Sequence, residues 1–200
     1  MKLKSRGCNV YLIEDEGKAY LIDTGTSADL ILRQVKELDG IIITHAHFDH
    51  FAAAYHVQKK FGCPVFVHEA DVPYILGEKK FQYSGLLGLL AKAGEKVFRA
   101  RPPEDIREAG DLKLNARIIH TPGHTPGSIS ILRDGELYCG DLLRGRKGLE
   151  LSPKSFCSDY NQYLKSVMML SDFDFRRIFP GHGNVGHREH YEDLLRSMEK

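Results

Sequence analysis

The stretch Thr44-His45-Ala46-His47-Phe48-Asp49-His50 follows directly on the apolar run Ile41-Ile42-Ile43. Three imidazoles and one carboxylate therefore lie within six residues, at the C-terminal end of a predicted buried strand. Because alternate residues of an extended chain face the same side, His45 and His47 can bind one metal ion. Where the chain turns out of the strand, Asp49 and His50 are directed towards a neighbouring point. The spacing predicts two adjacent metals rather than one.

Chance does not explain this motif. From the histidine and aspartate content of the chain, H-x-H-x-D-H should arise by accident in roughly 0.2% of chains of this length. The competing interpretation is a histidine-rich surface turn, which this low frequency disfavours.

Length and composition predict one globular domain that acts on small molecules. The chain has 200 residues, 42% of them hydrophobic, and a formal net charge of +1, which argues against general binding of nucleic acid or anionic membranes. No segment is apolar for long enough to cross a bilayer, and residues 1–6 lack the apolar stretch of a secretory signal. We therefore expect a cytoplasmic protein, either a monomer or a homodimer. The four scattered cysteines, without a C-x-x-C pair, are predicted to be reduced and buried.

Strands and helices alternate along the chain, which predicts an α/β fold with helices packed on sheet. The expected strands are 9–14, 19–22, 40–44, 64–67, 115–120, 128–132, 136–139 and 177–179. The expected helices are one capped by Ser27 with apolar positions Leu30, Ile31, Val35 and Leu38, and then 52–61, 159–170 and 188–198. The segments 19–23 and 136–141 each end a predicted hairpin in an aspartate. This repetition suggests a single domain, residues 1–200, built from two similar halves, approximately 1–110 and 111–200.

Three further candidate ligands each follow a predicted strand, where loops commonly carry functional side chains. His124 lies in the loop Thr121–Gly127, which contains two prolines and two glycines and is therefore stiff. Asp141 and His182 follow the strands 136–139 and 177–179. Taken singly, each is equally consistent with a structural role, but together they predict a shared metal centre.

The order H-x-H-x-D-H, T-P-G-H-T, G-D and P-G-H-G resembles the metallo-β-lactamase superfamily, most closely its glyoxalase II-like hydrolases. The resemblance implies a four-layer αββα sandwich of two mixed β-sheets flanked by helices, with a dinuclear site at the edge between the sheets. It implies these ligands: His45, His47 and His124 for metal one, Asp49, His50 and His182 for metal two, and Asp141 bridging both. The implied cofactors are two divalent metal ions, most simply zinc, with iron or manganese as alternatives.

The resemblance and the chemistry of the predicted site together imply a metal-dependent hydrolase. Water bound to zinc loses a proton near pH 7, so a metal-bridging hydroxide could attack the carbonyl of a small thioester, ester or lactone. Asp49 is the predicted catalytic residue, which would orient that hydroxide. Asp23 either holds a ligating imidazole through its free ring nitrogen or forms an Asx turn with Thr24 and Gly25.

Substrate contacts are predicted from residues near the last motifs. Arg144, Arg146 and Lys147 either hold a carboxylate or phosphate of the substrate or are solvated loop charges. Tyr160, at the start of a helix, either projects its hydroxyl towards the site or packs half-buried. The segment 76–94, apolar with flexible glycines, is either a lid over the metals or a core helix.

Two other functions remain open from the sequence. A mononuclear iron persulfide dioxygenase of the same superfamily resembles the same motifs, with iron held at His45, His124 and Asp141. A non-catalytic metal-binding or scaffold protein is the third possibility, disfavoured by the full set of ligand types. Ala46 occupies the position where oxygen-reducing diiron relatives carry a carboxylate, which argues against that branch.

Overall fold

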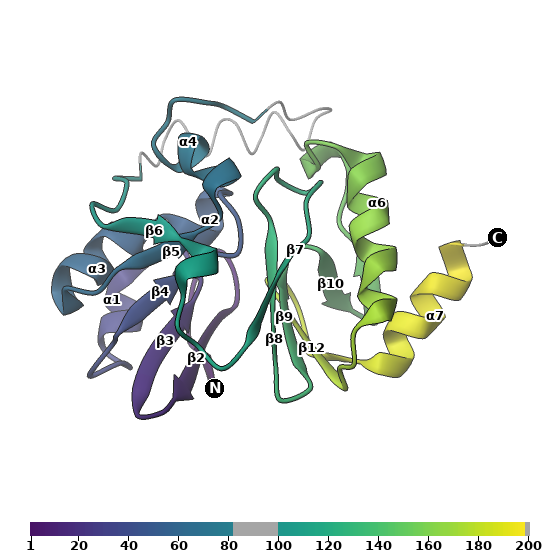
Figure 1. The fold of residues 1–200 in the computed structure, drawn as a ribbon, viewed down its shortest axis with the longest axis horizontal. Helices are drawn as coiled ribbons and strands as arrows, with labels where there is room; N and C mark the ends of the chain where they lie inside the picture. Colours follow the sequence, from purple (N-terminus) through teal and green to yellow (C-terminus); the bar gives the residue numbers. More distant parts are fainter. Residues whose placement is uncertain (82–99, 199–200) are drawn as a thin grey trace.

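Two β-sheets face each other, and helices cover their outer sides (Figure 1). The structure is a computed structural model and describes residues 1–81 and 100–198. The first sheet has the order β1 (Lys2–Leu3), β2 (Val10–Asp15), β3 (Lys18–Ile22), β4 (Gly40–Ile42), β5 (Val65–Val67) and β6 (Ile106–Glu108). The second has the order β13 (Gly186–His187), β12 (Arg177–Pro180), β9 (Glu136–Gly140), β8 (Ile129–Arg133) and β7 (Arg117–His120). A separate hairpin pairs β10 (Leu143–Arg146) with β11 (Gly148–Leu151).

The helices are short on the first sheet and longer on the second. Those that accompany the first sheet are α1 (Ala28–Leu32), α2 (Phe48–Phe51), α3 (Ala54–Phe61) and α4 (Val72–Ile75). The second sheet is covered by α6 (Tyr160–Met169) and α7 (Arg188–Met198) (Figure 1). Single 3-10 turns form η1 (Glu69–Asp71), η2 (Ala109–Asp111), η3 (Lys154–Phe156) and η4 (Leu170–Asp172).

Both sheets are mixed, as the sequence predicts. In the first, β3, β4, β5 and β6 run parallel, and β2 pairs antiparallel with β3. In the second, β12 runs parallel to β9, while β8 is antiparallel to its two neighbours. Because parallel strands end at the same edge, the segments that follow β9 and β12 emerge side by side. This places the Asp141 and His182 segments together.

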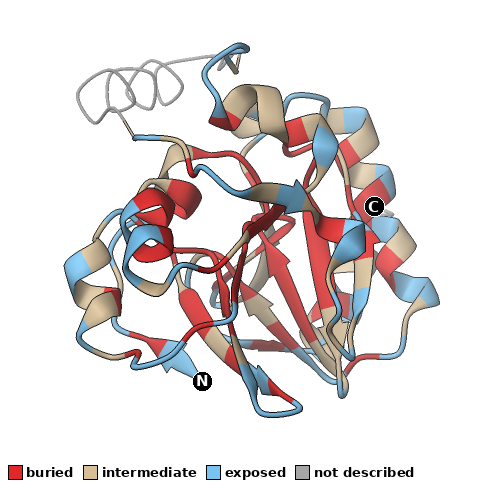
Figure 2. Ribbon diagram, turned by 60° about the vertical axis from the view of Figure 1, so that its left-hand side comes forward, coloured by how far each residue is buried: buried red, intermediate tan, exposed pale blue. Residues whose placement is uncertain are grey.

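Three apolar layers hold the sandwich together. The inner faces of the two sheets meet in a cluster that includes Tyr11, Ile42, Ile131 and Tyr138. A second cluster joins the first sheet to its helices, and a third, centred on the fully buried Tyr163, joins the second sheet to α6 and α7. Figure 2 shows this burial concentrated along the strands and on the inward sides of the helices. The predicted four-layer αββα fold is therefore confirmed, whereas the similarity of the two halves stays a prediction.

Several boundaries differ from those predicted. The helix after Ser27 ends at Leu32, and the Ser27 side chain makes no capping hydrogen bond. Val35 and Leu38 are buried although they follow that helix, so their spacing reflects core contacts of a loop rather than a continued helix. The helix predicted over 52–61 corresponds to α3, which begins at Ala54, and the short helix α2, which was not predicted, precedes it. Strands β1, β6, β10, β11 and β13 were not predicted. They are short, like several predicted strands, but they lack the apolar runs that marked those strands, because charged residues or glycines occur in each. Across 1–81 and 100–198, no helix combines the length and apolar character needed to span a membrane.

The loop that carries His124 is fixed against α6 by a glycine. Gly123 has φ of +121°, and a Cβ built there would lie 2.1 Å from the backbone nitrogen of Tyr163. Its amide donates to the carbonyl of Thr125 at 2.9 Å, and its own carbonyl accepts from the amide of Asp159 at 3.0 Å. Only glycine satisfies both the backbone conformation and this close approach.

Gly123→Ala should therefore lower the free energy of unfolding by about 3 kcal/mol or more, through backbone strain and displacement of α6. For a domain of this size the melting temperature should fall by roughly 6–12 °C, measurable by calorimetry. Gly110→Ala is the control, since its nearest neighbour would be 3.9 Å away. Equal melting temperatures for the two variants would contradict this account of the loop.

Candidate metal centre

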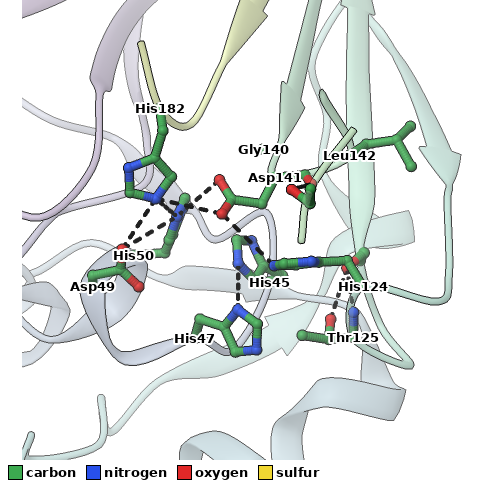
Figure 3. Close-up of polar contacts among 12 residues, drawn as sticks. His45, His47, Asp49, His50, His124, Thr125, Gly140, Asp141, Leu142 and His182 are labelled. Carbon is green, nitrogen blue, oxygen red and sulfur yellow. Dashed lines mark hydrogen bonds and ion pairs between the residues drawn. The ribbon is translucent and has the colours of Figure 1, made fainter. Parts of the chain in front are cut away.

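The seven predicted ligands converge at one edge of the sandwich, from four segments of the chain (Figure 3). His45 and His47 follow β4, and Asp49 and His50 belong to the short helix α2. The loop between β7 and β8 supplies His124. Asp141 directly follows the end of β9, and His182 lies two residues after the end of β12. The structure thus brings together every residue that the sequence predicts as a ligand.

His45, His47 and His124 form one compact group, called here the first triad. Their ligand atoms lie within 4.8 Å of one another, and His45 Nε2 is 3.2 Å from His47 Nδ1. All three residues are buried, with exposed fractions of 1%, 6% and 1%. The rings point towards a common centre rather than into solvent (Figure 3). This is the arrangement of nitrogen donors that one divalent cation requires.

Asp49, His50 and His182 form the second triad, again with ligand atoms within 4.8 Å. Asp49 Oδ2 lies 3.1 Å from His182 Nε2, and His50 Nε2 lies 3.4 Å from His182 Nε2. His50 is fully buried, whereas the Asp49 side chain is 38% exposed. The second triad is therefore the more accessible of the two.

Asp141 lies between the two triads (Figure 3). One carboxylate oxygen, Oδ1, is 3.4 Å from His50 Nε2. The other, Oδ2, is 3.7 Å from His124 Nε2 and 3.4 Å from His182 Nε2. A single carboxylate thus faces imidazoles of both triads.

Asp23 supports the imidazoles from behind. His50 Nδ1 donates to Asp23 Oδ2 at 2.7 Å, which leaves Nε2 facing the site. The Thr44 amide and hydroxyl donate to the same carboxylate at 2.8 and 2.9 Å. Thr44 Oγ1 in turn lies 3.0 Å from His45 Nδ1. Of the two roles predicted for Asp23, these contacts correspond to holding a ligating imidazole.

Burial sets the charge state of the first triad. It lowers the pKa of His45 and His47 well below the ordinary value and that of His124 to about 4, because a buried imidazolium is poorly solvated. Their mutual repulsion as cations would act in the same direction. At neutral pH these three rings are therefore neutral, with nitrogen lone pairs available to a metal.

The second triad is governed by its carboxylates. Burial disfavours the His50 cation, but Cys8 and the carboxylates of Asp23 and Asp141 together raise its pKa well above the ordinary value. Burial likewise disfavours the ionised form of Asp49, yet His50 and His182 lower its pKa to about 2. The pKa of Asp141 is also held well below its usual range, against burial, by the imidazoles around it. Both carboxylates are anionic at neutral pH.

Two buried polar atoms at this centre show that its residues are arranged to bind a metal. His124 Nε2 and Asp141 Oδ1 are buried and have no hydrogen-bond partner among residues 1–81 and 100–198. Leaving such an atom unsatisfied costs about 1–3 kcal/mol. Nitrogen and oxygen donors in two groups with a shared carboxylate match zinc, iron or manganese. The residues present therefore fit a pair of divalent cations.

Two of the three predicted basic substrate contacts line a cavity apart from the centre, and the third lies beside the segment that carries His182. Arg146 forms an ion pair with Glu150 at 3.1 Å across the β10–β11 hairpin, and with Lys147 it lines a separate cavity of about 290 Å³ that contains none of the seven ligands. Arg144 is partly buried beside Gly145, whose amide donates to the carbonyl of His182 at 2.9 Å. The predicted lid over 76–94 falls mostly outside the described residues.

Tyr160 packs against neighbouring side chains. Its ring stacks on Tyr163 with the centroids 5.5 Å apart, and the Lys154 ammonium lies 5.6 Å above it. These contacts correspond to the half-buried packing role that the sequence left open.

Two outer contacts were missed in the sequence. The Sγ of Cys157 lies 3.8 Å from His124 Nδ1, so it can accept a hydrogen bond from that ring nitrogen. Thr44 links His45 to Asp23, as described above. The position of Thr44 directly before His45 could have indicated this contact. Cys157 and His124 are 33 positions apart, so nothing in the sequence indicated theirs.

Comparison with known proteins agrees with this geometry. The family model for the metallo-beta-lactamase superfamily matches residues 3–182. A probable metallo-hydrolase of Methanocaldococcus jannaschii is 32% identical, with 94% of each chain covered, and a probable metallo-hydrolase of Bacillus subtilis is 28% identical over 88% of this chain and 80% of its own.

Solved structures give the same result for the fold. A metallo-beta-lactamase superfamily protein of Sulfolobus tokodaii superposes with a TM-score of 0.75 at 20% identity, over 100% of this chain and 86% of its own. The protein TTHA1623, solved in a di-iron-bound form, has a TM-score of 0.71 at 26% identity, over 90% of this chain and 89% of its own. With the family model spanning most of its length and the ligand residues of its motifs gathered at one edge of the sandwich, this chain belongs to the metallo-β-lactamase superfamily.

Proposed function

We propose that this chain is a metal-dependent hydrolase that holds two divalent cations and cleaves a small thioester, ester or lactone. One observation carries the proposal: the Asp141 carboxylate lies within 3.4–3.7 Å of imidazole nitrogens from both triads. A carboxylate so placed is suited to bridge two cations. The first triad would hold one cation, and the second triad would hold the other.

The chemistry divides between the metals and the chain. When bound, the cations would supply a nucleophilic hydroxide at neutral pH and polarise the carbonyl of the substrate. The first triad contributes neutral nitrogen donors, because burial keeps its imidazoles unprotonated. Asp49 is anionic and partly exposed, so it can accept a hydrogen bond from the nucleophile and orient it towards the substrate. Asp23 would hold His50 in a fixed orientation.

The metals are proposed to be zinc, with iron or manganese as alternatives. The donors are imidazoles and carboxylates, which zinc, iron and manganese all accept. TTHA1623 was solved with two irons, which supports a dinuclear centre and keeps iron as an alternative in this chain.

A small anionic molecule is the proposed substrate class. A cavity of about 640 Å³ adjoins His182 and is lined also by Lys2, Lys4, Ser5 and Asn9. No acidic side chain is among its lining residues, and two ammonium groups favour a ligand with a carboxylate or phosphate. Arg144 is proposed as an additional contact to the substrate, because the neighbouring Gly145 donates a hydrogen bond to the carbonyl of His182.

Asp141→Ala should reduce the zinc content from two per chain to one at most and abolish hydrolysis of a small thioester, because it removes the ligand that both cations share. Elemental analysis after dialysis, with circular dichroism to check the fold, measures this. Asp174→Ala, at an exposed acidic position, is the control and should keep both metals. Retention of both zinc ions and full activity by the Asp141 variant would refute the bridging role.

Asp49→Asn should lower kcat by about 10²–10⁴-fold with a much smaller change in KM, because the lost charge acts in the transition state. Since the pKa of Asp49 is about 2, the group stays anionic between pH 5 and 9. A limb of the pH–rate profile near neutrality therefore belongs to another group, and the variant should keep the shape of the profile at reduced amplitude. A shifted limb, or an unchanged kcat, would contradict this role; Asp174→Asn is the matched control.

The dioxygenase alternative is disfavoured by the complete second triad, which a single iron at His45, His124 and Asp141 would leave without a role. With zinc or iron bound, the protein should hydrolyse a thioester without consuming oxygen, and a small organic persulfide should cause no oxygen uptake. An oxygen electrode measures both. Turnover that depends on dissolved oxygen, with one iron per chain, would replace the hydrolase proposal.

A further inference from the structure

Asp71 is a fully buried carboxylate outside the predicted ligand set. It ends the 3-10 turn η1 and has an exposed fraction of 0%. Its Oδ2 accepts from the Ala46 amide at 2.7 Å and from the Thr125 hydroxyl at 2.6 Å. Its Oδ1 accepts from the Gly127 amide at 2.7 Å. Three donors from distant parts of the chain therefore meet on one side chain.

These donors belong to the two segments that carry the first triad. Ala46 lies between His45 and His47, and Thr125 directly follows His124. The first segment leaves β4 of one sheet, and the second connects β7 to β8 of the other. Asp71 thus ties the backbone of one sheet's metal-binding segment to that of the other.

The second segment is built to receive this carboxylate. A Cβ at Gly127 would lie 2.7 Å from the backbone nitrogen of Asp71 and 2.8 Å from its Cγ, so only glycine allows the approach. Ser128 Oγ accepts from the Thr125 amide at 3.0 Å and lies 2.8 Å from Thr125 Oγ1. The loop is therefore held in one conformation around the Asp71 contacts.

Hydrogen bonds, rather than an ion pair, hold the Asp71 carboxylate within the described parts of the chain. Within the described parts of the chain, no lysine, arginine or histidine nitrogen lies within ion-pair distance of it. A buried carboxylate without a cation is costly, even with three hydrogen bonds. A divalent cation in the adjacent first triad would offset that cost.

Asp23 has a different set of contacts. It bonds the His50 ring directly and reaches His45 only through Thr44. Within residues 1–81 and 100–198, Asp71 forms no hydrogen bond with a ligand of the second triad, and its side-chain hydrogen bonds come from the two first-triad segments. The two buried carboxylates therefore support the site in separable ways.

We propose that Asp71 is a positioning residue for the first metal site, which holds the His45–His47 and His124 segments at the separation that one cation requires. This inference rests on the proposed dinuclear centre. Asp71→Asn keeps the size of the side chain but replaces one accepting oxygen with an NH2 group, so at least one of the three donors loses its partner. We expect a selective loss of affinity at the first site.

The test measures zinc affinity by competition with a chromophoric chelator in two backgrounds. In His182→Ala, which keeps the first triad whole, Asp71→Asn should weaken zinc binding by about 10–100-fold. In His124→Ala, which keeps the second triad whole, the same change should alter affinity by less than about threefold, because the hydrogen bonds to Asp71 come from the segments of the first triad. Thr125→Val, which removes a single donor to Asp71, should act in the same direction with a smaller effect, and it serves if Asp71→Asn fails to fold.

Asp39→Asn is the matched control, since Asp39 also accepts a backbone hydrogen bond, from the Ala19 amide at 2.8 Å, outside both triads. It should leave zinc affinity unchanged in both backgrounds. Equal losses at the two sites, or no loss at the first site from either Asp71→Asn or Thr125→Val, would overturn the inference. A wild-type chain that binds fewer than two zinc ions would refute the dinuclear proposal instead. The zinc affinity measured in the His182→Ala background would still test the role of Asp71, because that background needs only the first site.

Discussion

The packing of the two sheets through their inner faces is the constraint on which the rest of the structure depends. Tyr11, Ile42, Ile131 and Tyr138 belong to one buried cluster drawn from both sheets, so neither sheet can shift without exposing apolar surface. That packing fixes the relative position of the strand ends. The segments after β4, β9 and β12, together with the loop between β7 and β8, therefore meet at one edge. The metal centre is a consequence of this registration, because no single segment supplies enough ligands for even one of the proposed cations.

Bringing so many titratable groups together has an electrostatic cost that shapes the centre. Burial keeps the first triad neutral, whereas the second combines a histidine of raised pKa with the anionic carboxylate of Asp49, and the anionic Asp141 lies between the two triads. The unsatisfied Nε2 of His124 and Oδ1 of Asp141 indicate a site arranged for a cation. The hydrogen bonds behind the imidazoles, from Asp23 and Thr44, limit the reorganisation that binding would require. The hydrogen bonds that hold these side chains and the donor types of the side chains thus both suit a site for a cation at this edge.

The sequence was most informative where residue type and position relative to a strand both carried a signal. Alternation and apolar runs located most of the strands of both sheets, and the four motifs identified every residue that the structure brings into the two triads. Prediction failed where elements were short or where burial rather than helical structure produced the spacing. Val35 and Leu38 show the second case, since their side chains are buried from a loop that follows α1.

By itself, the sequence determined the ligand types, their order and their placement at strand ends, because these depend on local backbone geometry and on the donor chemistry of each side chain. Only the tertiary structure decided which residues support them. Asp71 is separated from Ala46 by 25 positions and from Gly127 by 56, and Cys157 from His124 by 33. Nothing local marks these partners, because their contacts exist only once the two sheets have packed. The tertiary structure also decided the position of Arg146 and Lys147. Both are close to Asp141 in sequence, but the pairing of the β10–β11 hairpin places them at a separate cavity.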